Sequence, residues 1–290
     1  MKYLKKNKLL LLSIILILII LISLFDSDNN IDYFNVGIIS IDGTITESQE
    51  IIENLNDFNK RDDIDAIVLK INSPGGAVVP SQEIYSKVNE ISNIEGAKPI
   101  VASIGSLGAS GGYYIAIGAD QIIANPGSIV GSIGVIMNFP IAKDLLDKIG
   151  LKFETIKSGK YKDSGSPFRE SNVDDSEYFD SIVLNLHEQF VLEVSNQRNI
   201  NINKIKSLAN GQIFTGTMAY DNNLIDTLGT FEDALNITKK MTNITYEIRL
   251  IYPDEEHSIF SSIFENINSL KLILRGFHNM PLYIMGGMYD

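Results

Sequence analysis

The chain has 290 residues, of which 44% are hydrophobic and 21% charged, so it is long enough for one large domain or two small ones. Its formal net charge of -12 argues against a nucleic-acid partner, because binding to phosphates depends on Lys and Arg. The absence of cysteine excludes disulfides, thiolate metal sites and cysteine nucleophiles, and the three histidines are too dispersed for a zinc site. We therefore expect neither a metal nor another cofactor.

The N-terminus pairs four lysines in residues 1–8 with an uncharged apolar stretch over residues 9–25. As a helix, that stretch would span about 25 Å, close to the thickness of the bilayer hydrocarbon. No A-x-A-like cleavage site follows, so we expect an uncleaved transmembrane anchor rather than a signal peptide. The positive-inside rule then predicts a single-pass protein of the cell membrane, with residues 1–8 in the cytoplasm, a polar linker over 26–34, and the remainder extracytoplasmic.

Short apolar runs alternate with amphipathic stretches in the next part of the chain. The expected strands lie at residues 35–43, 64–71, 98–105 and 120–126. The expected helices lie at residues 48–60, at 81–92 and directly after Ser110. Strands and helices in alternation predict an α/β fold with a mostly parallel sheet covered by helices.

The C-terminal third is less regular. Helical periodicity runs over residues 174–208, and the pattern then predicts a strand at 246–252 and an amphipathic helix at 259–277. The chain ends in an apolar segment, NMPLYIMGGMYD. We expect this tail to pack on its own domain, with a subunit contact or occupancy of a binding groove as the alternatives.

Two loops follow predicted strands, at the strand ends where α/β folds form their sites. The first, NSPGG at residues 72–76, has paired glycines whose N–H groups can face an anion or a peptide oxyanion, although it also suits a tight turn. The second, GSLGASGG, presents Ser110 among small residues at a helix start, where the N–H of Gly111 and the helix N-terminus favour negative charge. Close packing alone would also explain those small residues.

A nucleophilic serine needs a base. His187 falls in the middle of a predicted amphipathic helix, which is more typical of a helix-surface residue than of a triad member. Lysine can serve when burial disfavours its ammonium form, and Lys157, Lys160 and Lys162 lie in one segment. Their spacing does not choose among them.

Five motifs in order, NSPGG, GASGGYYIA, GSIVGSIGV, SGKYKDSGSPFRE and GQIFTGTMAYDNNLIDTLG, resemble the signal peptide peptidase A family of membrane-bound Ser-Lys peptidases. The likeness covers residues 36–234. It implies a Clp protease/crotonase-like βαβ superhelical fold, with a peptidase domain over 35–240 and a strand and helix extension over 241–290. NSPGG alone would also fit Clp proteases.

The resemblance also implies residue roles. Ser110 corresponds to the nucleophile and Lys162 to the general base, while Ser132 corresponds to a serine that hydrogen-bonds the lysine amine. The oxyanion hole maps onto the backbone N–H groups of Gly76 and Gly111. Where the family has Thr two residues before that second serine, this chain has Val130, which removes one hydroxyl and leaves the dyad intact.

The activity implied by the resemblance is that of a serine endopeptidase that hydrolyses remnant signal peptides and other membrane-associated peptides outside the cytoplasm. The resemblance further implies a homo-oligomeric ring, an octamer, in which neighbouring chains contribute Ser and Lys. Two alternatives stay open. A crotonase-like acyl-CoA-handling enzyme would share the oxyanion loops but explains neither the anchor nor the lysine, and a non-enzymatic membrane scaffold predicts a broken dyad.

Overall fold

The computed structural model describes residues 33–254 and 281–285. The expected anchor at 9–25 and the expected helix at 259–277 lie outside these residues, as does most of the linker. Within the described part of the chain, none of the helices combines the length and the hydropathy needed to cross a bilayer.

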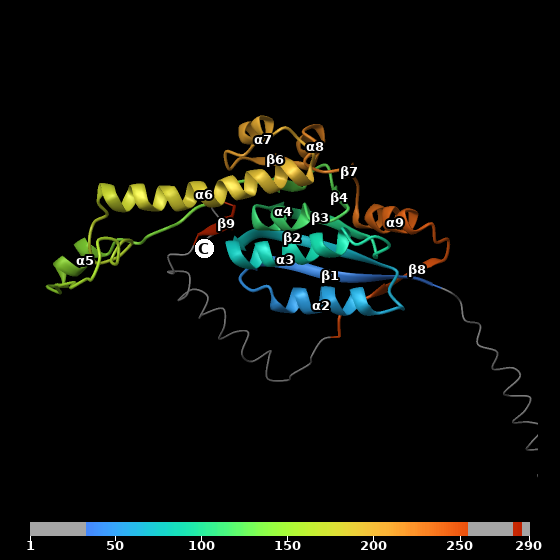
Figure 1. The fold of residues 1–290 in the computed structure, drawn as a ribbon, viewed down its shortest axis with the longest axis horizontal. Helices are drawn as coiled ribbons and strands as arrows, with labels where there is room; N and C mark the ends of the chain where they lie inside the picture. The colour runs from blue at the N-terminus through green and yellow to red at the C-terminus, as the bar shows by residue number, and fades with distance from the viewer. Residues whose placement is uncertain (1–32, 255–280, 286–290) are drawn as a thin grey trace, which may run out of the picture. The chain divides into compact units, whose positions relative to one another are not determined.

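A mixed, mostly parallel sheet forms the centre of the domain (Figure 1). Its longest path runs β6-β5-β3-β2-β1-β8, with β4 and β9 joined to β3 and β2, and β7 joined to β4. The strands are β1 (Tyr33–Ile45), β2 (Ala66–Ala77), β3 (Ile100–Ala109), β4 (Gln121–Ala124), β5 (Ile129–Gly131), β6 (Ile213–Thr215), β7 (Thr227–Leu228), β8 (Glu247–Ile251) and β9 (Leu282–Ile284). The pairs β1–β2, β2–β3, β3–β4 and β3–β5 are parallel, whereas the pairs β5–β6 and β2–β9 are antiparallel. The predicted α/β class and mostly parallel sheet are confirmed.

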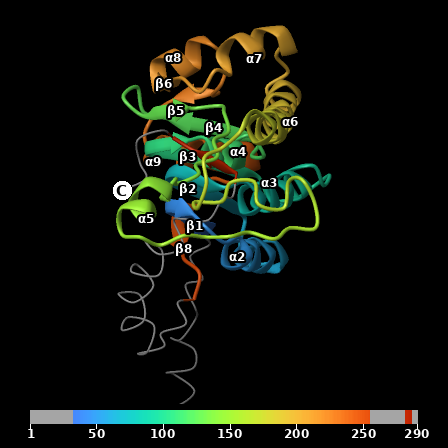
Figure 2. The ribbon, with the colours of Figure 1, turned by 90° about the vertical axis from the view of Figure 1, so that its left-hand side faces the viewer.

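Helices cover both faces of the sheet (Figure 2). They are α2 (Gln49–Lys60), α3 (Val78–Ser92), α4 (Gly111–Ala116), α5 (Lys143–Lys148), α6 (Val173–Gln197), α7 (Ile202–Leu208), α8 (Gly216–Asp221) and α9 (Phe231–Thr242). Successive side chains of β1 and β2 enter opposite clusters: Ile67 and Leu69 pack with α2, α3 and α4, while Val68 packs with α9. Burial on both faces explains why these strands read as unbroken apolar runs.

Two boundaries differ from the sequence prediction. The NSPGG segment is not a tight turn, because β2 continues through it to Ala77, with Gly75 and Gly76 paired to Thr44 and Ile45 of β1. The long helical pattern divides into α6 and α7, since Asn199 adopts a left-handed backbone (φ 49°) that an α-helix cannot contain.

Candidate active site

Ser110 and Ser132 stand at the ends of two neighbouring parallel strands. Ala109 at the end of β3 pairs with Gly131 at the end of β5, and the Ser110 N–H donates to the Gly131 carbonyl over 2.7 Å. Each serine, directly after its strand, has a positive φ, 50° for Ser110 and 52° for Ser132. This region is sparsely populated by residues other than glycine, and such strain gathers at functional sites.

The hydroxyl of Ser110 is buried and unpaired. The residue is 0% exposed, precedes α4, and accepts a backbone hydrogen bond from Tyr114 over 2.8 Å. Its Oγ has no hydrogen-bond partner among the described residues. Buried hydroxyls are nearly always satisfied, so a strained serine with a free hydroxyl is the arrangement expected of a nucleophile awaiting its base and substrate.

The two glycine loops meet beside this serine. A Cβ built on Gly111 would lie 3.2 Å from the Gly75 Cα, so the backbones are in close contact and side chains are excluded there. The Gly75 N–H donates to Ser73 Oγ over 3.1 Å, and that hydroxyl donates to the Gly43 carbonyl over 2.6 Å. The Gly75 N–H is therefore engaged within its own strand, and Gly76 lies in ladders with β1 and β9.

The strand β9 fills the edge of the sheet at this point. Gly76 pairs with Tyr283 in an antiparallel ladder, and the Met285 N–H donates to the Pro74 carbonyl over 2.9 Å. The Tyr283 carbonyl oxygen lies 3.1 Å from a Cβ built on Gly111 and only 2.0 Å from one built on Gly75. The chain's own C-terminal segment therefore brings a peptide carbonyl between the two glycine loops.

Aromatic packing holds β9 in place. The Tyr283 ring stacks on Tyr114 at a centroid distance of 5.2 Å and lies 4.8 Å from Phe190, and its hydroxyl donates to the Leu186 carbonyl over 3.0 Å. Tyr283 is fully buried, and burial raises the pKa of its phenol. The expectation that the tail packs on its own domain is confirmed for these residues, and they also line the edge expected for a peptide.

The structure separates the three lysines that spacing could not rank. Lys157 forms an ion pair with Asp163 at 2.6 Å, and Lys160 pairs with Asp174 at 2.8 Å. The hydrogen bond to Asp174 raises the pKa of Lys160, which holds that amine in its ammonium form. Lys162 is exposed, and among the described residues its amine makes no hydrogen bond or ion pair. It is the lysine of this segment without a carboxylate partner.

A Ser-Lys contact is not formed within the described part of one chain, because neither Ser110 Oγ nor the Lys162 amine has a hydrogen-bond partner there. Among the described residues, the Ser132 side chain makes no hydrogen bond to Lys162 either. His187 lies half-buried on α6, and its Nε2 also lacks a partner among the described residues, so no Ser-His pair is formed in that part of the chain.

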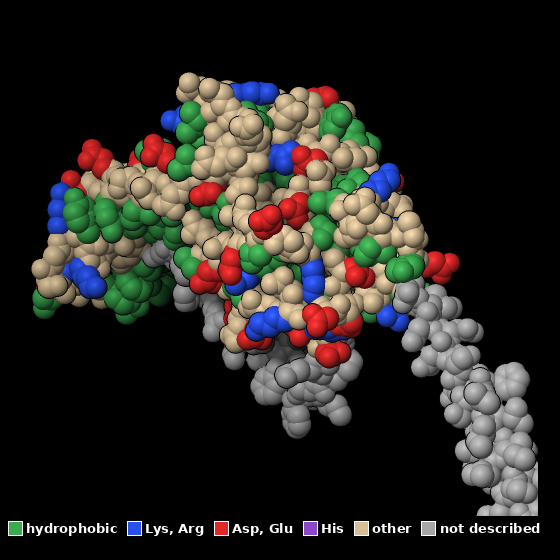
Figure 3. Space-filling model, turned by 45° about the vertical axis from the view of Figure 1, so that its right-hand side comes forward, with side chains coloured by type: hydrophobic (Ala, Val, Ile, Leu, Met, Phe, Trp, Pro, Cys, Tyr) green, Lys and Arg blue, Asp and Glu red, His purple; other side chains and the backbone are tan. Residues whose placement is uncertain are grey.

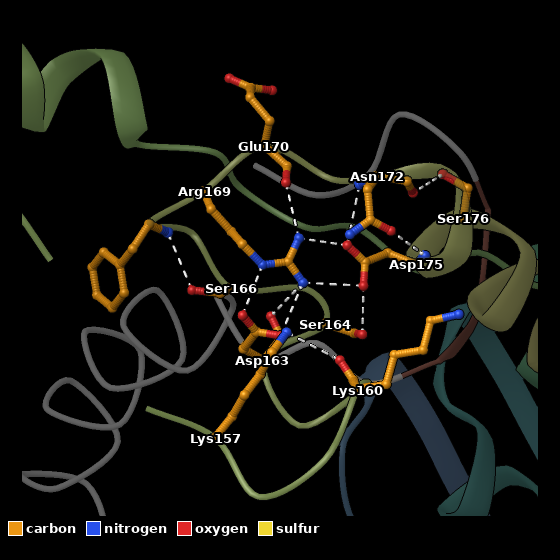
Figure 4. Close-up of polar contacts among 11 residues, drawn as sticks. Lys157, Lys160, Asp163, Ser164, Ser166, Arg169, Glu170, Asn172, Asp175 and Ser176 are labelled. Carbon is orange, nitrogen blue, oxygen red and sulfur yellow. Dashed lines mark hydrogen bonds and ion pairs between the residues drawn. The ribbon is translucent and has the colours of Figure 1, made fainter. Parts of the chain in front are cut away.

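An ionic cluster that sequence reasoning missed surrounds the lysine segment (Figure 4). Arg169 binds Asp163 through Nε and Nη2, at 2.9 and 3.1 Å, and also binds Asp175 at the start of α6. Arg169, with Lys157, lowers the pKa of Asp163 to about 2, and Arg169, with Ser164, depresses the pKa of Asp175. The only sequence signal for this cluster is the even spacing of Asp163, Arg169 and Asp175, which lie six residues apart.

Comparison with known proteins places the chain among peptidases. A family model described as peptidase family S49 matches residues 93–245, and one described as Clp protease matches residues 28–129. The chain is 46% identical over 129 residues to a protein of Synechocystis named a putative protease, covering 44% of the chain and 47% of that protein. It is 37% identical over 154 residues to an Enterococcus faecium protein named a putative signal peptide peptidase SppA, covering 53% of the chain and 45% of that protein.

A more distant relative adds a named catalytic type. The chloroplastic serine protease SPPA of Arabidopsis thaliana is 36% identical over 138 residues, which is 47% of the chain and 20% of that protein. The matches span about half the length of the first two relatives and less of this one. The sheet described above is thus a Clp protease-like α/β fold.

Proposed function

Because the chain belongs to peptidase family S49, we propose that it is a serine endopeptidase whose nucleophile is Ser110 and whose general base is Lys162. The observation that carries the proposal is the Ser110 hydroxyl, which is buried, unpaired and held at a positive φ beside two closely packed glycine loops. Catalysis of this kind requires a nucleophile whose side chain is held in a fixed position beside backbone N–H donors.

The proposed reaction proceeds through an acyl-enzyme. The neutral amine of Lys162 takes the proton from Ser110 Oγ as the oxygen attacks the scissile carbonyl carbon. Backbone N–H groups of Gly76 and Gly111 stabilise the negative oxygen of the tetrahedral intermediate. The intermediate collapses as Lys162 returns the proton to the leaving amine, and water, deprotonated by the same lysine, then releases the acyl group. The role of Ser132 in this scheme is to orient the lysine amine.

Extended peptides are the substrates that fit the sheet edge. The antiparallel pairing of β9 with Gly75, Gly76 and Ala77 supports binding of a peptide as an added strand, which places a carbonyl at the glycine loops. We propose remnant signal peptides and other membrane-associated peptides as this class, cleaved by a domain that residues 9–25 anchor outside the cytoplasm. The name of the Enterococcus faecium relative is consistent with that class.

A homo-oligomer would complete the site, since no hydrogen bond joins Ser110 to Lys162 among the described residues of one chain. The segment from Ile141 to Phe168 exposes large apolar side chains, which Figure 3 shows gathered on the part of the molecule that holds α5. Its apolar members include Ile156, which is 95% exposed, and Leu145 at 62%. An apolar surface of this kind favours contact with a second copy, and we propose the ring of eight that the family resemblance implies.

Four variants test the proposal on a fluorogenic peptide. Ser110→Ala and Lys162→Ala are expected to lose at least about 1,000-fold in kcat/KM, because a dyad acts as one unit. Ser106→Ala, an exposed serine on the same strand, and Lys160→Ala, a carboxylate-paired lysine, are the matched controls and should keep activity near wild type. Full activity of Ser110→Ala would refute the proposed function, and full activity of Lys162→Ala would refute the assigned base.

A further inference from the structure

We propose that Arg169 is a positioning residue for Lys162: it fixes the turn that carries the lysine on the start of α6 and neutralises the adjacent carboxylate of Asp163. This inference rests on the proposed role of Lys162 as general base. It assigns a task to the ionic cluster of Figure 4, which has no part in the reaction scheme above.

The cluster joins two parts of the chain through one guanidinium. On one side, Arg169 Nη2 donates both to the carbonyl and to the carboxylate of Asp163, each at 3.1 Å. Asp163 directly follows Lys162 in sequence. On the other side, the same nitrogen donates to Asp175 Oδ1 over 3.0 Å. A planar guanidinium with five donors can make this double contact in a fixed geometry, which a lysine cannot reproduce.

Asp175 is itself held at the start of a long helix. Its carboxylate accepts from the Asn172 N–H over 3.1 Å, and the Asn172 side chain accepts from the Asp175 N–H over 2.9 Å, which completes a capping box on α6. Ser164 Oγ donates to the same carboxylate over 2.5 Å. The Asp175 side chain is only 3% exposed, so the anchor point is rigid and shielded from water. The turn of residues 159–166 is thereby tied to a 25-residue helix.

The three aspartates of the cluster are paired with cations other than Lys162. The charged side chains of the turn and of the start of α6 are Lys157, Lys160, Lys162, Asp163, Arg169, Glu170, Asp174 and Asp175. Lys157, Lys160 and Arg169 pair with the three aspartates, and Arg169 takes only the backbone carbonyl of Glu170. Lys162 keeps no carboxylate of its own among the described residues. A general base must lose its proton before it acts, and the Asp163 carboxylate, next to Lys162 in sequence, would favour the ammonium form of the lysine if Arg169 did not pair with it.

The experiment measures kcat/KM against pH for the full chain on a fluorogenic peptide. Arg169→Gln removes one positive charge and the double contact. We expect its kcat/KM to fall at least tenfold near neutral pH. The acid limb of the profile, where activity falls as Lys162 becomes protonated, should move to higher pH by about one unit. The double variant Arg169→Gln/Asp163→Asn restores the local net charge. Its acid limb should return to the wild-type pH. Its kcat/KM should recover only in part, because the turn still lacks the contact through Arg169 to the start of α6.

Two further variants separate positioning from folding. Arg169→Lys keeps the positive charge but lacks the planar guanidinium that contacts Asp163 and Asp175 together. Its acid limb should therefore stay at the wild-type pH while kcat/KM falls. Asp174→Asn breaks the exposed ion pair with Lys160 in the same segment and should leave both rate and limb unchanged. A uniform loss of activity in Arg169→Gln with an unmoved limb, or a limb that the double variant fails to restore, would overturn the inference. Should Ser110→Ala retain hydrolysis, the proposed function fails instead, and the two failures are thus distinguishable.

Discussion

The Ser110 N–H and the Gly131 carbonyl are joined by a 2.7 Å hydrogen bond that ties the proposed nucleophile to the next strand of the sheet. This bond brings Ser110 and Ser132 to one sheet edge, although 21 residues separate them in sequence. The lysine segment is anchored separately, on α6. The two members of the proposed dyad, Ser110 and Lys162, therefore belong to different elements of the fold. The first prediction tests whether a neighbouring chain brings them together.

Subunit crossing predicts that two inactive variants complement each other. Ser110→Ala keeps a functional Lys162, and Lys162→Ala keeps a functional Ser110, so a mixed ring would contain sites with both wild-type residues. We expect co-expressed or exchanged mixtures to recover up to about one quarter of wild-type activity, as random mixing of two chains predicts for contacts between neighbours. The measurement is peptidase activity of each protein alone and of the mixture.

A double variant, Ser110→Ala/Lys162→Ala, is the control for that mixture, because mixed with either single variant it does not supply the missing group and no site should be active. If the mixture of single variants stays inactive although mass analysis shows mixed oligomers, the dyad is formed within one chain.

The close contact of the glycine loops predicts a large difference between two glycines of similar backbone conformation. Gly75 (φ 97°) and Gly43 (φ 69°) both have left-handed backbones, but a Cβ on Gly43 meets nothing within 4 Å. Gly43→Ala should cost about 1–2 kcal/mol for the backbone alone. Gly75→Ala adds overlap with the Tyr283 carbonyl, at 2.0 Å from the built Cβ, and should cost about 1–3 kcal/mol more. Chemical denaturation of both variants checks the difference; equal costs would show that the loops separate readily.

Much of this arrangement could be predicted from local sequence. Alternating apolar runs located β1, β2 and β3, and the small residues around Ser110 located a strand-to-helix junction there. The extension of β2 through Gly76 was missed, because its pairing partners come from distant parts of the chain. Thr44 lies about 30 residues before Gly75 and Tyr283 about 200 residues after Gly76. A local sequence pattern does not reveal pairing between strands so far apart.

The lysine segment shows the same limit. Lys157, Lys160 and Lys162 look alike in sequence, and they differ only in which carboxylate lies opposite each one. Those partners are set by the turn of residues 159–166 and by the capping box of α6, neither of which follows from helical or strand periodicity. The family resemblance chose Lys162, and that assignment stays a prediction that the unpaired amine supports.

Removing the C-terminal strand should expose the nucleophile. In a chain ending at residue 280, no Tyr283 carbonyl lies at the glycine loops, so a fluorophosphonate probe is expected to label Ser110 several-fold faster than in the full chain. The loss of the buried Tyr283 ring would at the same time destabilise the domain by about 3–5 kcal/mol. Labelling is therefore measured well below the melting temperature.

Tyr283→Phe is the matched control for the truncation, because it keeps the strand and the ring and loses only the hydroxyl that donates to Leu186. It should label at the rate of the full chain. Equal labelling of the truncated and full chains would mean that β9 does not restrict access to Ser110.

The ionic cluster should survive mild acid, and the sign of this effect follows from the carboxylate. Arg169 and Lys157 lower the pKa of Asp163 to about 2, whereas an unfolded aspartate titrates near about 3.9. A lowered pKa gives stability that is fully present above about pH 4 and is lost as the pH falls through about 2. Hydrogen exchange corrected for intrinsic rates should therefore show residues 157–175 still protected at about pH 3.5. In Arg169→Gln, where the main cause of the low pKa is gone, that protection should already be lost at the same pH, while the β2 and β3 amides remain protected in both proteins. Equal protection in the two proteins at about pH 3.5 would show that Arg169 does not hold the segment together.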